Sequence, residues 1–134
     1  MTAGYSGTPL PKKLGVKVGM RAAALHAPKH YTKLLGPTPG VRIGSRVAAD
    51  LDFLHAFFRS AGDLAAAFPQ LAASLATHGM LWISWPKRSS PLAGDLDGNG
   101  VRKIGLAHGL VDVKVCAVDE DWSGLKFVRR RKDR

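Results

Sequence analysis

The chain has 134 residues, of which 46% are hydrophobic, so it is long enough for one folded domain and too apolar for a disordered protein. Its net charge of +10 favours anionic partners such as nucleic acid or phosphorylated small molecules. The single cysteine, Cys116, excludes an internal disulfide and fits a reducing compartment.

The positive charge is concentrated at the two ends of the chain. Residues 1–46 contain eight Lys or Arg and no acidic residue, and residues 126–134 have a net charge of +5. The part between them has a net charge of −3. We expect the basic tail, residues 129–134, either to be solvated or to contact an anion.

No targeting or membrane segment is expected. The chain does not open with a charged stretch followed by an apolar one, so we predict no signal peptide and a cytoplasmic location. Residues 64–86 carry no Asp, Glu, Lys or Arg. Pro69 and Gly79 interrupt this stretch, which therefore fits a helix and a strand better than a membrane span, and no membrane partner is expected.

The first part of the chain is predicted to contain a flexible segment, residues 1–8, and then short elements. Proline at its start and glycine at its end delimit a helix over residues 9–14. Apolar runs bounded by glycine and proline predict a strand, a helix and a second strand over residues 20–25, 28–35 and 41–44.

The residue pattern in the middle of the chain predicts a strand that is covered on both faces, followed by a helix. Residues 51–58 are apolar on both alternating faces, which is typical of a strand with helices on both sides. Ser60 with Asp63 resembles a helix N-terminal capping box. We expect the helix to end at His78-Gly79 and to be kinked or split by Pro69.

A buried strand with two tryptophans follows at residues 80–86. Trp82 and Trp85 differ by three positions, so they point to opposite faces, and we expect one of them to be in the core. A loop and a helix ending at His108-Gly109 come next. Alternating apolar residues then predict a hairpin with strands at residues 110–118 and 124–128.

This order of elements predicts a single domain over residues 1–134. Strands alternate with helices, which implies a mostly parallel sheet with helices on both faces. The predicted fold is therefore a three-layer, Rossmann-like α/β fold with a C-terminal antiparallel hairpin.

Ligands of open α/β sheets bind beyond the carboxyl ends of the strands. Cations and an indole at those ends could hold an anionic, planar ligand, because Arg and Lys bind anions and Trp offers a stacking face. The alternative is that the tryptophan packs and the cations are solvated. The candidate ligand-binding residues are His26, Arg59, Ser60, Trp85 and Lys87.

No metal site and no cofactor are expected. Residues 95–100 match the first half of a calcium-binding loop, but the twelfth position of that loop is Leu106 instead of glutamate. The acidic residues there are better explained as caps of the next helix. His26 and His30 have no third ligand nearby in the sequence.

The basic ends of the chain make nucleic acid a possible partner. Such binding would be electrostatic, because no recognition helix or aromatic platform is evident. The candidate nucleic-acid residues are Lys12, Lys13, Arg129, Arg130, Arg131 and Lys132.

Several strings of the sequence resemble a bacterial family known as domain of unknown function 3052. The resemblance covers nearly the whole chain and is most specific in two strings, Trp82-Ile83-Ser84-Trp85-Pro86-Lys87 and Trp122-Ser123-Gly124-Leu125-Lys126-Phe127. The family brings no assigned activity, so the resemblance implies no catalytic residues.

The order of elements in the second half also resembles class I methyltransferases. That resemblance implies a glycine-rich turn after the first strand and an acidic residue after the second. Here the first position holds residues 26–30, without glycine, and the second holds Arg46. The chain departs from the methyltransferase pattern at both places.

Three functions are compatible with these observations. The one we favour is a non-catalytic module that binds an anionic small molecule or a protein partner at the carboxyl edge of the sheet. The alternatives are an electrostatic nucleic-acid-binding protein and a small methyltransferase-like enzyme without the usual glycine-rich loop.

Overall fold

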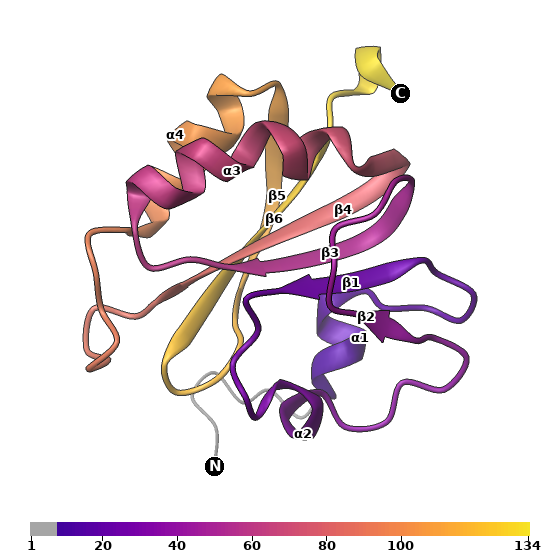
Figure 1. Cartoon of the computed structure of the whole chain (residues 1–134), viewed down its shortest axis with the longest axis horizontal. Coiled ribbons are helices and arrows are strands. Elements are labelled where there is room, and N and C mark those ends of the chain that lie inside the picture. The colour runs from indigo at the N-terminus through magenta and orange to yellow at the C-terminus, as the bar shows by residue number, and fades with distance from the viewer. Residues whose placement is uncertain (1–7) are drawn as a thin grey trace.

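The computed structural model describes residues 8–134, so the predicted flexible segment lies outside the described residues except for Thr8. Four α-helices, six strands and a final 3₁₀ turn follow one another along this part of the chain (Figure 1). None of the helices is long and apolar enough to cross a membrane. The elements are α1 (Leu10–Leu14), β1 (Ala22–Leu25), α2 (Tyr31–Leu35), β2 (Ile43–Gly44), β3 (Leu51–Phe57), α3 (Ala61–Ala73), β4 (Leu75–Pro86), α4 (Gly98–Ala107), β5 (Leu110–Ala117), β6 (Trp122–Arg129) and η1 (Arg131–Asp133).

The strands form one sheet in the order β2-β1-β3-β4-β6-β5. Strands β1 to β4 are parallel, and β6 lies antiparallel between β4 and β5. Helices α3 and α4 cover one face, and α1 and α2 lie on the other (Figure 1). The predicted three-layer fold with a mostly parallel sheet and a terminal antiparallel hairpin is confirmed.

Two hydrophobic cores fill the spaces between the layers. Strand β3 contributes to both: Leu54 packs with α3 and α4, and Phe53 packs with α1 and α2. This confirms the prediction that the strand is covered on both faces. Trp82 is fully buried on the α1 side, and Trp85 is half-buried on the α3 side, so the two indoles do point to opposite faces.

Helix α3 ends earlier than predicted and is not split. It runs through Pro69 to Ala73, and His78-Gly79 lies within β4, so the predicted cap at this pair is wrong. A Cβ on Gly79 would overlap the carbonyl oxygen of Leu51, at the point where the β3–β4 register shifts. The glycine therefore permits a close backbone approach between strands.

The predicted caps at the start of α3 and at both ends of α4 are present, whereas α2 begins at Tyr31 and not at Pro28. Ser60 Oγ accepts a hydrogen bond from the Asp63 backbone N–H at the start of α3, and Asp97 Oδ1 does the same for Gly100 at the start of α4. Helix α4 ends at Ala107 with His108 as its C-cap residue, and Gly109 has a positive φ of 87°.

Candidate functional site at the carboxyl edge of the sheet

The site follows from the direction of the strands. Strands β1, β3 and β4 are parallel, so the segments that follow them lie along the same edge of the sheet. The turn between β5 and β6 joins this edge, because Trp122 pairs with Pro86 at the end of β4. The chain continues from β1 to β2 on one side, whereas β3 lies on the other side of β1. This is a topological switch point, where α/β sheets bind ligands.

His26 lies at this switch point. It follows β1 directly and has φ of 57°, a left-handed conformation that favours glycine. Its exposed ring makes an edge contact with Phe58 after β3, with centroids 5.3 Å apart. Together with Phe57, Asp63 and neighbouring residues of α3, it borders a hollow of about 400 Å³. A tight turn is thus made without a glycine.

Arg59 and Ser60 make contacts within the protein. Arg59 Nε donates to the Leu92 carbonyl oxygen at 2.7 Å, and Ser60 caps α3. Asp95 Oδ1 accepts from the Ala61 backbone N–H at 2.8 Å. These two hydrogen bonds, one of them from Arg59, hold the loop before α4 against the start of α3.

Trp85 and Lys87 line a different hollow of about 400 Å³, together with Arg88 and Asp97. Lys87 Nζ also reaches the β5–β6 turn, where it donates to the Asp119 carbonyl oxygen at 2.7 Å. The five candidate ligand-binding residues thus lie along one edge but do not line one pocket. His26 borders the hollow at α3, and the indole and the lysine line the hollow before α4.

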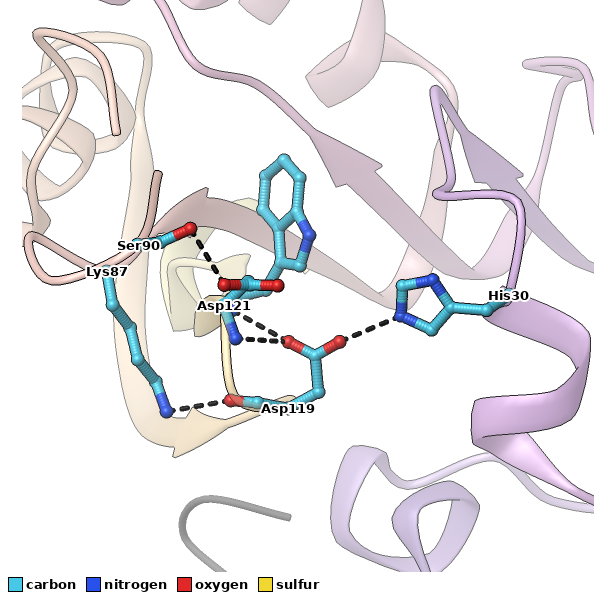
Figure 2. A network of polar contacts seen from close by, with 6 residues as sticks. His30, Lys87, Ser90, Asp119 and Asp121 are labelled. Carbon is cyan, nitrogen blue, oxygen red and sulfur yellow. Dashed lines mark hydrogen bonds and ion pairs between the residues drawn. The ribbon is translucent and has the colours of Figure 1, made fainter. Parts of the chain in front are cut away.

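Figure 2 shows a polar network at the same edge. His30 Nε2 lies 2.9 Å from Asp119 Oδ2, and Asp119 Oδ1 accepts from the backbone N–H groups of Asp121 and Trp122, each at 2.8 Å. Ser90 Oγ lies 2.8 Å from Asp121 Oδ1. The network joins the segment after β1, the segment after β4 and the β5–β6 turn.

The geometry of this network suits proton transfer. The Asp119 side chain is 9% exposed and accepts three hydrogen bonds, so its position is fixed. It holds His30 through Nε2, whereas the His30 side chain is 51% exposed. An imidazole oriented by a buried carboxylate can accept a proton at its other nitrogen, Nδ1. No local pattern could have revealed the pair, because 89 positions separate its members.

A second polar chain lies beneath this edge in the α1-side core. Tyr31 Oη lies 2.9 Å from His55 Nδ1, and His55 Nε2 lies 2.7 Å from Ser84 Oγ. Burial lowers the pKa of His55 from 6.5 to about 3 and raises the pKa of Tyr31 above its usual value. The imidazole is therefore neutral and links α2, β3 and β4.

A smaller hollow of about 290 Å³ lies where β1 and β2 end against α2. Tyr31, Leu35 and Ile43 give it apolar walls. Polar groups come from Lys29, Thr32 and Ser45. In the chain, His30 of the polar network stands between two of the lining residues, Lys29 and Tyr31.

The candidate nucleic-acid residues lie in two separate regions. Lys12 and Lys13 are in α1, and Lys13 Nζ lies 3.3 Å from the Ala117 carbonyl oxygen. Arg129 donates to the carbonyls of Ala72 in α3 and Leu75 at the start of β4, and Arg130 donates to the Leu106 carbonyl. Arg131 and Lys132 are exposed in η1. Nucleic-acid binding by these residues stays a prediction.

Across residues 8–134, no group of three or more His, Cys, Asp or Glu side chains could hold a metal ion. Asp97, from the half-matching calcium motif, caps α4. The acidic residues of the motif thus serve helix termini, because Asp95 accepts from the first residue of α3.

The sequence matches no protein-family model and no curated protein. The resemblance to domain of unknown function 3052 therefore stays a prediction.

Solved structures of S-adenosylmethionine (SAM)-dependent methyltransferases have the same fold. Magnesium protoporphyrin IX methyltransferase of Synechocystis PCC 6803, with bound SAM, is 11% identical, with a TM-score of 0.60 over 90% of this chain and 74% of that one. A SAM-dependent methyltransferase of Aquifex aeolicus is 14% identical, with a TM-score of 0.63 over 87% and 85%. A TehB-like methyltransferase of Corynebacterium glutamicum is 13% identical, with a TM-score of 0.53 over 96% and 91%.

The chain has the fold of class I methyltransferases. This confirms the architectural resemblance inferred from the sequence. It also corrects our favoured function, because these neighbours support the methyltransferase-like alternative over a non-catalytic binding module.

Proposed function

We propose that this protein is a small methyltransferase-like enzyme that binds SAM at the carboxyl edge of the sheet, in the hollow where β1 and β2 end against α2. The observation that carries the proposal is the strand order, with β1 between β2 and β3 and an antiparallel β6 between β4 and β5. SAM-dependent methyltransferases share this fold over most of the chain.

The residues of this hollow and of the turn after β1 can contact SAM, although the chain lacks the glycine-rich turn and the acidic residue of the methyltransferase pattern. The hollow at α2 offers apolar walls to a planar base and the hydroxyls of Thr32 and Ser45 to a ribose. The ammonium group of Lys29 can form an ion pair with the carboxylate of SAM. The left-handed φ of His26 gives the tight turn that a glycine would otherwise make.

Bound SAM would supply the methyl group, and the chain's own residues would handle the proton of the acceptor. Asp119 orients His30, whose half-exposed imidazole can take a proton at Nδ1. Tyr31, His55 and Ser84 fix the start of α2 against β3 and β4, and thereby hold the segment that carries His30. This segment replaces the glycine-rich turn.

We expect the protein to bind SAM and S-adenosylhomocysteine saturably in isothermal titration calorimetry. Thr32→Trp should abolish this binding, because the added ring would occupy the hollow that Thr32 lines. Lys33→Trp is the matched control, since Lys33 is also exposed in α2 but is not among the lining residues. Absence of saturable binding by the unmodified protein would refute the proposal, as would equal binding by the two variants.

A further inference from the structure

A groove of about 720 Å³ lies on the α1 side of the sheet. It is bounded by α1, by the turn before β1 and by the segment before β2, so it is at the amino ends of these strands. Most of its lining is apolar, including Pro9, Pro11, Val16, Val18, Leu35 and Val41. Val18 is 78% exposed, which leaves a hydrophobic side chain in water. We name this feature the α1 groove.

Lysines surround one side of the α1 groove. Lys12 and Lys17 belong to its lining. Lys126 Nζ lies about 4 Å from where a Cβ on Gly15, another lining residue, would be. Lys114 stands opposite Lys126 in the β5–β6 pairing. The ion pairs found among residues 8–134, His30–Asp119 and Arg102–Asp112, include none of these lysines.

This charge arrangement is unfavourable in the free protein. Like charges directly opposite each other destabilise a sheet. Burial, followed by the charges of Lys114 and Lys17, keeps the pKa of Lys126 below its usual value. An anion next to these ammonium groups would relieve the repulsion, and an apolar group in the groove would cover Val18.

We propose that the α1 groove binds a free long-chain carboxylate, with the acyl chain against the proline and valine walls and the carboxylate at Lys17 and Lys126. The volume of the groove is in the range of small-molecule sites. The α1 groove shares Leu35 and Thr38 with the hollow at α2, but Lys17 and Val18 line only the groove, so the proposal does not depend on SAM binding.

The lining argues against nucleic acid as the occupant. Single strands are held by cations along the backbone and by aromatic side chains under the bases. The described lining of the α1 groove contains no aromatic residue, and its two lysines are both near α1. An apolar chain with one anionic end matches this distribution better.

Titration calorimetry with dodecanoate, below its micelle concentration and at low salt, tests the proposal. We expect saturable binding with one site, and much weaker binding of dodecanol, which has the same chain and no charge. Lys17→Glu should weaken dodecanoate binding by about tenfold or more, through loss of the charge contact. Val18→Asp should weaken it comparably without lowering the melting temperature, because Val18 is exposed.

Lys103→Glu is the matched control, since Lys103 is exposed on α4, on the opposite face of the sheet. It should leave dodecanoate affinity within about twofold, because exposed charges far from a ligand are screened. The proposal would be overturned if dodecanol bound as well as dodecanoate, or if both groove variants kept normal affinity. Binding of single-stranded DNA in place of dodecanoate would overturn it as well and assign the lysines to nucleic acid.

Discussion

His55 is the residue whose burial has the clearest energetic consequence. It is 0% exposed and bonds on both sides, to Tyr31 and to Ser84, so its imidazole is held neutral. Either hydroxyl can donate to the ring while the ring donates to the other, and the chain is satisfied in both directions. Removing the imidazole would leave two buried hydroxyls with fewer partners.

We expect the stability of the folded protein to decrease as the pH is lowered, because of His55. Its pKa is about 3 in the folded protein and 6.5 in the unfolded chain. Between these values the unfolded chain binds the extra proton, so unfolding becomes easier as pH decreases, by up to about 1.4 kcal/mol per pH unit. Urea denaturation between about pH 6.5 and pH 4.5 measures this slope.

The control for this prediction is His55→Gln. Glutamine cannot take up a proton, so the variant should have a clearly smaller slope in this pH range. It should also be less stable at neutral pH by about 1–3 kcal/mol, because Tyr31 and Ser84 lose good partners. An unchanged slope would show that other groups cause the acid sensitivity.

Close contacts between helix and strand residues determine how the helices lie on the sheet. Gly105 of α4 faces Phe127 of β6, and a Cβ at this position would overlap the aromatic ring. Trp82 fixes α1 in a similar way, by donating from Nε1 to the Leu14 carbonyl oxygen at 2.8 Å. The absence of a side chain at Gly105 thus positions α4, and the hydrogen bond from Trp82 positions α1.

We expect Gly105→Ala to destabilise the protein by about 1–3 kcal/mol, because the overlap with Phe127 outweighs the better helix propensity of alanine. Gly62→Ala in α3 is the matched control. A Cβ on Gly62 would lie 3.7 Å from Ser60 Oγ, an ordinary contact. The control should gain about 0.5 kcal/mol in chemical denaturation. A stabilised Gly105→Ala protein would contradict the packing of α4 on β6.

Charge is unevenly distributed over the protein. The chain has a net charge of +10, and its first 46 residues contain no acid. Strands β5 and β6 add Lys114 and Lys126 to the same α1 side. Self-repulsion of this kind reduces stability and attracts anions.

We therefore expect Lys126→Gln to stabilise the protein by about 0.5 kcal/mol at low salt. The gain should shrink as salt screens the repulsion in the unmodified protein. Thermal unfolding at low and high salt measures both effects. Arg102→Gln serves as a control that removes an exposed ion pair with Asp112, and it should change stability little or lower it slightly. A loss of stability in Lys126→Gln would mean that the lysine has a stabilising partner.

The candidate site was only partly predictable from the sequence. Chain order and strand direction placed His26, Arg59 and Lys87 along one edge, but the loop before α4 binds Arg59 and separates the hollows. The pair His30–Asp119 and the buried His55 chain have no local signature. In both cases the interacting residues are far apart in the sequence and come together only when the chain folds.

Most of the elements and their layers follow from patterns within short stretches of the sequence. Apolar periodicity over β3, the caps at Ser60 and Asp97, and the three-residue offset of the tryptophans depend on neighbours a few positions apart, so they can be read locally. The end of α3, the polar network in Figure 2 and the positions of the lysines around the α1 groove became evident from the folded chain. Those features depend on contacts between segments far apart in the chain. Backbone approach, burial and charge repulsion between such segments cannot be inferred from neighbouring residues in the sequence.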